Sequence, residues 1–288
     1  YKSIGGAVFL VITLFISSQV MAQDACVSGT VPVIGCKISI DDGTFDLTGD
    51  IAASGLSGII FTNADRNTLN YTGNINSEIY GSMGVYLANS TFNNITIDGN
   101  INVGASDLYG IYSSSSTGSN TIIMNGNLTT NRYQGYGYFN IFEDNTNFTL
   151  NGNITTNGDD APGILLYMTD GANITLNGNI NVQGETRLLN GRGIDIMNSS
   201  GITITNLGTI TTAGDDPYDI YVRGTSTVAT LNNRQSGLTY YGKIPTNYNA
   251  RINSTSDYGK IIFSNVSGTT SFGIYDGSVL ESDTTYAS

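Results

Sequence analysis

The ten residues "NITLNGNINV" at 173–182 repeat a pattern that occurs three times earlier in the chain. The earlier copies are "NITIDGNINV" at 94–103, "TIIMNGNLTT" at 121–130 and "NFTLNGNITT" at 147–156. In each copy a Gly-Asn pair separates two stretches in which apolar and polar residues alternate, a pattern typical of β-strands with one buried face. A strand–turn–strand unit that recurs at a regular spacing predicts an elongated fold of stacked coils.

Two series of glycines define the period of this repeat. The first series follows the first strand of each unit and comprises Gly49, Gly73, Gly99, Gly126, Gly152, Gly178 and Gly208. The second precedes an apolar pair and comprises Gly58, Gly84, Gly110, Gly137, Gly163 and Gly193, with Asp219 in the last unit. Both advance by about 26 residues, which is shorter than the roughly 40 residues of a four-stranded propeller blade. No segment between them shows helical periodicity. We therefore predict an all-β fold, a right-handed parallel β-helix of about seven coils over residues 44–224.

The residue after the first glycine is predicted to form a ladder. In parallel coils, equivalent residues stack about 4.8 Å apart. Asparagines recur at this position: Asn74, Asn100, Asn127, Asn153 and Asn179. We expect their side chains to stack inside the coils and to satisfy turn backbone groups that would otherwise be buried unpaired. We expect the glycines before them to supply a left-handed or strained turn conformation.

Residues 1–22 differ from the rest of the chain. Lys2 precedes a largely apolar run of 13 residues, and small or β-branched residues precede Gln23. This pattern predicts a secretory signal peptide that is cleaved before Gln23. A transmembrane anchor is the alternative, but the run is too short to cross a hydrocarbon layer of about 30 Å.

The two ends of the repeat region depart from its pattern. Residues 23–43 are predicted to form an N-terminal cap, in which Cys26 and Cys36 form a disulfide, because an exported chain without histidine offers these cysteines no further metal ligand. After Asp219 the period fades. Residues 225–288 are therefore predicted to form irregular closing coils or a small separate β-region.

Composition limits the chemistry that the chain can perform. Its 11 basic and 23 acidic residues give a net charge of −12 without a basic cluster, which argues against nucleic acid as a partner. The chain has no histidine, so Ser-His-Asp and Cys-His arrangements are excluded and zinc lacks its commonest ligand. We expect no cofactor and no metal.

Aspartates recur at one turn position, as Asp107, Asp160 and Asp216. Carboxylates grouped in this way bind Ca²⁺ or act as acid and base in β-helical pectinolytic enzymes. An Asx-type turn is the simpler interpretation. A polysaccharide-cleaving enzyme would also need a basic residue nearby, but Arg187 and Arg192 are predicted to lie two or more coils from Asp107. The sequence therefore favours a protein without catalytic activity, with such an enzyme as the alternative.

A column of large side chains is predicted on the outside of the coils, two residues after the second glycine. It comprises Ile60, Tyr86, Tyr112, Phe139 and Leu165. We predict that the rings of Tyr86, Tyr112 and Phe139 form an exposed stripe that binds a glycan or a protein. The alternative is that these rings only hold the coils in register.

A signal peptide followed by Asn- and Gly-rich "ITLNGNI" coils resembles the passenger domain of autotransporters. These are Gram-negative surface proteins in which a β-helix is exported through a C-terminal outer-membrane barrel. The segment "TLNNRQSGLTYYGKIPTNYNARINSTSDYGK" at 230–260 is similar to the region between repeats and barrel in that family. The chain has no series of lipid-facing strands, so the resemblance identifies it as a fragment that lacks the barrel or as one exported by a separate partner. The resemblance implies a cell-surface, outer-membrane or extracellular location, an outer-membrane β-barrel as export partner, and adhesion as the function.

Overall fold

The computed structural model describes residues 24–53, 57–80, 82–114, 118–184, 191–214, 217–280 and 282. The predicted signal peptide at 1–22 lies outside these residues. Within the described part of the chain, no helix is long and apolar enough to cross a membrane.

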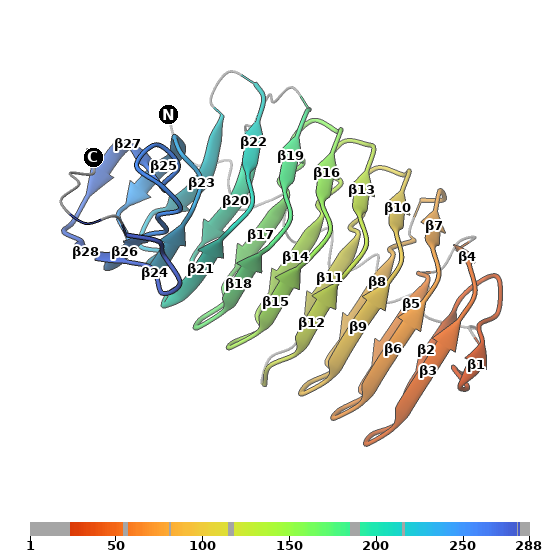
Figure 1. The fold of residues 1–288 in the computed structure, drawn as a ribbon. Helices are drawn as coiled ribbons and strands as arrows, with labels where there is room; N and C mark the ends of the chain where they lie inside the picture. The colour runs from red at the N-terminus through yellow and green to blue at the C-terminus, as the bar shows by residue number, and fades with distance from the viewer. Residues whose placement is uncertain are drawn as a thin grey trace.

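The described strands form three parallel sheets that run along one elongated stack, from β1 at one end to β28 at the other (Figure 1). The first sheet has the order β1 (Gly29–Thr30), β3 (Thr44–Thr48), β6 (Thr68–Thr72), β9 (Asn94–Asp98), β12 (Thr121–Met124), β15 (Asn147–Leu150), β18 (Asn173–Leu176), β21 (Ile202–Asn206), β24 (Val228–Asn233), β26 (Asn247–Ala250) and β28 (Ser271–Ile274). The second has the order β4 (Ile51–Ala53), β7 (Ile75–Ser77), β10 (Ile101–Val103), β13 (Leu128–Thr130), β16 (Ile154–Thr156), β19 (Ile180–Val182) and β22 (Ile210–Thr212). The third has the order β2 (Cys36–Ile38), β5 (Ile59–Thr62), β8 (Val85–Ala88), β11 (Ile111–Ser114), β14 (Tyr138–Ile141), β17 (Ile164–Tyr167), β20 (Arg192–Met197), β23 (Tyr218–Arg223), β25 (Leu238–Lys243) and β27 (Ile261–Ser267).

The prediction of an all-β, parallel β-helix with a repeat of about 26 residues is confirmed. Each strand pairs in parallel with its equivalent one coil away; for example, Ile95 in β9 lies beside Ile122 in β12. Alternate side chains along each strand point inward and are buried, so that Ile95, Ile97 and Ile101 lie in one continuous core. Burial of aliphatic side chains from every coil supplies the main stabilising free energy.

The solenoid has about nine turns, whereas the sequence predicted about seven. Seven coils, from β3 to β23, contribute one strand to each sheet. The next two, β24–β25 and β26–β27, contribute strands only to the first and third sheets. The spacing in the first sheet falls from 27 residues, between Ile204 and Leu231, to 17, between Leu231 and Tyr248. A coil shortened by one strand no longer has the 26-residue period, so the sequence repeat did not reveal these two turns.

The glycines of the first series are required by contact between coils. A Cβ atom on Gly178 would lie 1.6 Å from the backbone oxygen of Gly152, and one on Gly99 would lie 1.7 Å from that of Gly73. Within this series only Gly49 and Gly73 have positive φ angles. The expectation that these glycines supply a left-handed backbone was therefore wrong for most of them, because the close approach of successive turns excludes any side chain.

The predicted asparagine ladder forms, but on the outside of the solenoid. The backbone N–H and Nδ2 of Asn100 donate to Oδ1 of Asn74 at 3.1 and 3.0 Å. The backbone N–H groups of Asn127, Asn153 and Asn179 donate in the same way along the column, as do the Nδ2 groups of Asn153 and Asn179. Four of the five side chains are exposed, and that of Asn74 is half-buried. The expectation of an internal ladder was wrong, because the turn between the first and second sheets points this side chain toward solvent.

A second asparagine ladder lies inside, in the turn before the first sheet. The backbone N–H of Asn67 donates to Oδ1 of Asn93 at 2.8 Å, and that of Asn93 donates to Oδ1 of Asn120 at 2.9 Å. The ladder then meets Glu143, whose Oε1 accepts from the backbone N–H and Nδ2 of Asn120 at 2.8 and 2.7 Å. These four side chains are fully buried. They satisfy turn donors that have no access to water.

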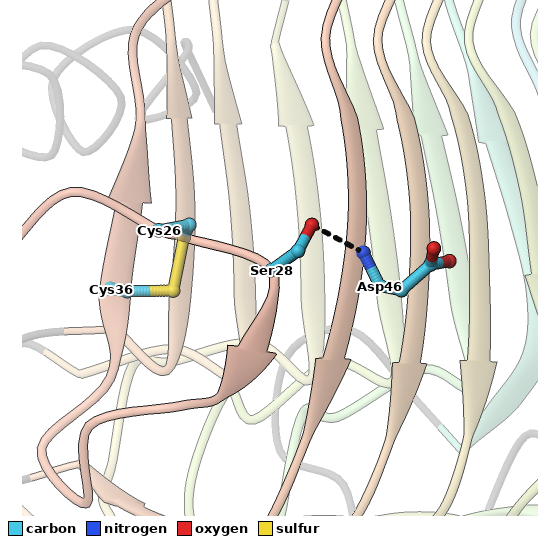
Figure 2. Close-up of a disulfide and its surroundings, with 4 residues drawn as sticks. All are labelled: Cys26, Ser28, Cys36 and Asp46. Carbon is cyan, nitrogen blue, oxygen red and sulfur yellow. Dashed lines mark hydrogen bonds between the residues drawn. A yellow bond between two sulfur atoms is a disulfide. The ribbon is translucent and has the colours of Figure 1, made fainter.

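The N-terminal end is tied down by a disulfide between Cys26 and Cys36 (Figure 2). Both half-cystines are buried. Nearby, the backbone N–H of Cys26 donates to the oxygen of Lys37 at 2.8 Å, and the backbone N–H of Asp46 donates to Oγ of Ser28 at 3.2 Å. The segment around the disulfide therefore covers the first full coil and blocks its edges.

The second sheet ends at β22 because side chains take the place of its next strand. Oε1 of Gln235 accepts from the backbone N–H of Ile210 at 2.7 Å, and its Nε2 donates to the oxygen of Ile210 at 2.9 Å. The same Nε2 donates to Oδ2 of Asp219 at 3.2 Å. Asp219 occupies the position that the glycines of the second series hold in the earlier coils. There a side chain would collide with the second-sheet strand of the next coil; a Cβ on Gly193, for example, would lie 2.1 Å from Cγ2 of Ile210. No strand of the second sheet follows Asp219 in the described residues, which leaves room for its side chain.

Candidate functional site

The outward side chains of the third sheet form one column across most of the solenoid. The strand register places the following residues side by side in successive coils: Ile60, Tyr86, Tyr112, Phe139, Leu165, Asp195, Tyr221 and Tyr241. The predicted stripe of Tyr86, Tyr112 and Phe139 is therefore a set of direct neighbours. Beyond Leu165 the column changes from apolar to charged and then to aromatic residues.

The predicted stripe is covered by two further rings. Tyr109 and Tyr136 come from the turns before β11 and β14, and their ring centroids lie 5.0 Å apart. Tyr109 stacks on Tyr112 at 5.4 Å, and both covering rings meet the edge of Phe139. Only 8% of Tyr112 and 4% of Phe139 is exposed, whereas Tyr86 is half-buried. The expectation of an exposed stripe was thus wrong for Tyr112 and Phe139, because the turns fold their own tyrosines over these rings.

Burial also changes the ionisation of these phenols. It raises the pKa of Tyr86 to about 12, and it raises the pKa values of Tyr109 and Tyr112. The three side chains therefore stay neutral at physiological pH. They make a second, external apolar layer on the third sheet.

A buried ion cluster follows the aromatic layer. Asp195 is 0% exposed and accepts from Nη1 of Arg192 at 2.8 Å and from Nε of Arg223 at 2.8 Å. Nη2 of Arg223 donates to the second carboxylate oxygen. Burial acts to lower the pKa of Arg223, but the hydrogen bond and charge of Asp195 outweigh it and raise that pKa. Two guanidinium groups share one carboxylate, so the cluster carries one net positive charge.

The aromatic side chains beyond this cluster form a stack. The Arg192 guanidinium carbon lies 3.7 Å from the centroid of the Tyr221 ring. Tyr221 stacks on Tyr241 with a centroid distance of 4.4 Å and an interplanar angle of 4°. The next strand places Ser264 beside Tyr241, a side chain too small to cover the ring.

An open groove of about 450 Å³ lies on this part of the sheet. Its side-chain lining includes Tyr221, Arg223, Tyr241, Lys243, Asn265 and Ser267. Nδ2 of Asn265 donates to the Tyr241 hydroxyl. The groove thus combines two aromatic residues, two cations and neutral hydrogen-bonding groups, which can contact a polar ligand.

Charge is unevenly distributed along the sequence. Residues 24–186 contain 3 basic and 15 acidic residues, a net charge of −12. Residues 187–260 contain 7 basic and 5 acidic residues, a net charge of +2. The groove therefore lies in the basic part of an acidic chain, which favours an anionic ligand there over the rest of the surface.

The aspartates considered as catalytic candidates take part in turns. Asp107 and Asp160 have left-handed backbones, with φ angles of 58° and 52°, and the equivalent Gln134 has 52°. Aspartate tolerates this conformation better than most residues. Asp216 and Arg187 lie outside the described residues. In the described part of the chain, no group of three or more His, Cys, Asp or Glu side chains is placed to hold a metal ion.

Sequence reasoning missed the groove. Its signal was present as the excess of basic residues after position 186, together with Tyr221 and Tyr241. The 26-residue spacing does not link Tyr221 to Tyr241, because the intervening coil is short. Comparison of the chain with protein-family models, curated proteins and solved structures found no match.

Proposed function

We propose that the chain is a non-catalytic, exported β-solenoid that displays a ligand-binding groove on its third sheet. The observation that carries the proposal is the open groove beside the Tyr221–Tyr241 stack. Aromatic faces are favoured contact surfaces for sugars and proteins. The ligand is accordingly a glycan or a surface protein, and the function resembles that of an adhesin.

The resemblance to autotransporter passengers supports a location at the cell surface. It also supports an outer-membrane β-barrel as the export partner. The disulfide between Cys26 and Cys36 fits an oxidising compartment. A long stack of coils suits this role, because each coil is stabilised by its neighbours and the groove sits on a rigid support.

The surroundings of two carboxylates, Asp195 and Glu143, support a binding role over catalysis. Asp195 is neutralised by two guanidinium groups and has no exposed surface. Glu143 is enclosed in the core. A general acid or base must reach the substrate, and neither carboxylate does so. A polysaccharide-cleaving enzyme is the alternative function, and assaying the glycan for cleavage distinguishes the two.

The test is adhesion of the purified full chain to host cells and to immobilised glycans. We expect binding, and we expect Tyr241→Ser to weaken it about tenfold or more, because loss of an aromatic anchor commonly costs about 2 kcal/mol or more. Tyr80→Ser is the matched control, since Tyr80 is exposed and lies outside the groove lining. Adhesion that Tyr241→Ser leaves unchanged would contradict the proposed surface. New reducing ends in the glycan would contradict the non-catalytic role.

A further inference from the structure

The aromatic part of the groove is fixed in place before any ligand arrives. Arg192 covers one face of Tyr221, and Tyr241 covers the other. In the strand register Tyr241 lies beside the small Ser264, the Tyr218 ring packs near it at a centroid distance of 4.9 Å, and Asn265 donates a hydrogen bond to its hydroxyl group. A ring held in this way loses little conformational entropy on binding. Its apolar face suits the C–H face of a sugar ring.

One cation of the groove, the Arg223 guanidinium group, is also held in place. Arg223 has five N–H donors and places two of them on Asp195, which fixes the direction of its guanidinium group. Lys243 is exposed on the neighbouring strand and lines the same groove. The groove lining contains no aspartate or glutamate. Asp195, Arg192, Arg223 and Lys243 together carry a net charge of +2.

Neutral donors and acceptors complete the lining. Asn265 and Ser267 are exposed on β27 and line the groove, and Nδ2 of Asn265 donates to the Tyr241 hydroxyl. Hydroxyl and amide groups pair with sugar hydroxyls, whereas a fixed guanidinium binds a carboxylate through paired hydrogen bonds. An acidic peptide without aromatic residues or proline would use the cations but has no ring to place against Tyr241.

We infer that the groove binds an acidic saccharide, with its carboxylate at Arg223 and Lys243 and a sugar ring against Tyr241. This inference rests on the proposed binding function and names the class of its ligand. A hexuronate is the simplest sugar that offers both a carboxylate for the two cations and a sugar ring for Tyr241. Binding weakens as salt rises, because the two cations are accessible to counterions.

The experiment is calorimetric titration of the full chain with an oligogalacturonate and, in parallel, with a neutral galactose oligosaccharide. We expect the acidic sugar to bind and the neutral one to bind at least about tenfold more weakly, because a hydrogen bond to a charged group contributes about 1.5–3 kcal/mol. Lys243→Ala is expected to weaken binding of the acidic sugar about tenfold. Lys260→Ala is the matched control, because Lys260 is also exposed but lies over the Tyr258 ring and outside the groove lining.

The outcomes separate this inference from the proposed function. Equal affinity of wild type and Lys243→Ala, or displacement of the sugar by polyglutamate at equal charge, would overturn the acidic-saccharide inference. Adhesion to cells that the oligogalacturonate fails to inhibit would overturn it as well, while the display function stands. Cleavage of the bound oligogalacturonate would overturn the display function and leave the binding inference in place.

Discussion

In the middle coils, from β8 to β17, aromatic side chains cover the outer face of the third sheet. In the closing coils, from β23 to β27, the same face is open and carries cations. Tyr109 and Tyr136 seal the first region. In the second region, Tyr241 faces the small Ser264, and Lys243 is exposed. The same sheet thus serves as a packing surface in one region and as a binding surface in the other.

The difference follows from how strictly each region repeats. In the middle coils, equivalent positions carry equivalent residues, because each coil packs on a copy of itself. A groove needs a change of residue between neighbouring coils, such as the change from Tyr241 to the small Ser264. The solenoid provides this change where its repeat shortens and Gln235 caps the last strand of the second sheet.

The most severe test of the repeating region is Gly178→Ala. A Cβ at this position would lie 1.6 Å from the oxygen of Gly152, so the two coils cannot keep their spacing. We expect a loss of at least about 4 kcal/mol of unfolding free energy, measured by urea denaturation, because neither backbone can move without disturbing its neighbours.

Gly104→Ala is the control for this substitution. The nearest atom to a Cβ at Gly104 is Cδ of Glu78 at 3.5 Å, an ordinary contact, and Gly104 has no positive φ. It is expected to change the unfolding free energy by less than about 1 kcal/mol. Equal effects of the two alanines would show that coil spacing does not require glycine.

The second test concerns the covered stripe. Tyr112→Ser removes a ring that packs on Tyr86, Tyr109 and Phe139, and we expect a loss of about 3 kcal/mol, as for other large-to-small changes at buried aromatic positions. Ligand binding by the folded variant should stay at the wild-type level. Thermal unfolding and adhesion, measured on the same preparation, check both parts. Lost adhesion at unchanged stability would restore the stripe as the binding surface.

The third test concerns the end of the second sheet. Gln235→Ala leaves the backbone N–H and C=O of Ile210 without their partners, and we expect a loss of about 2 kcal/mol. Hydrogen exchange at the Ile210 amide should accelerate. Gln183→Ala, at an exposed position, is the matched control. Unchanged protection of Ile210 would show that the side chain does not act as a cap.

The sequence predicts the repeating coils well, because strands that pair in register place equivalent residues at a near-constant interval along the chain. It predicts poorly whether a turn side chain points into the core or toward solvent. The Asn74–Asn179 column and the Asn67–Asn120 column both follow the period, yet only the second is buried, and periodicity alone does not distinguish the two sides of a turn. The inner column is also short, because Glu143 ends it.

The site was hidden from the sequence for a related reason. Exposure of the stripe depends on Tyr109 and Tyr136, which belong to turns whose path the strand alternation does not describe. The groove depends on a coil in which Gln235 replaces a strand. A pattern search finds what each coil shares, whereas a binding site is made by what one coil has and its neighbours lack.

The smallest expected effect concerns Glu143, where the inner ladder of the middle coils ends. Burial raises the pKa of this carboxyl above its ordinary value of 4.5, although Ser113 and Asn120 donate hydrogen bonds that act to lower it. The folded chain therefore binds more protons than the unfolded chain between the two pKa values. This contribution to stability is fully present below the unfolded pKa and is lost as the pH rises through the folded pKa.

Glu143→Gln removes the titration while its amide oxygen still accepts from Asn120. We expect the variant to gain stability relative to wild type as the pH rises from about 4 to about 7, measured by urea denaturation at each pH. Asp107 and Asp219, whose pKa values burial also raises, are present in both chains and cancel from the difference. Glu78→Gln controls for the loss of one carboxyl at an exposed position. A difference between Glu143→Gln and wild type that does not change with pH would mean that Glu143 ionises in the folded core as easily as in the unfolded chain.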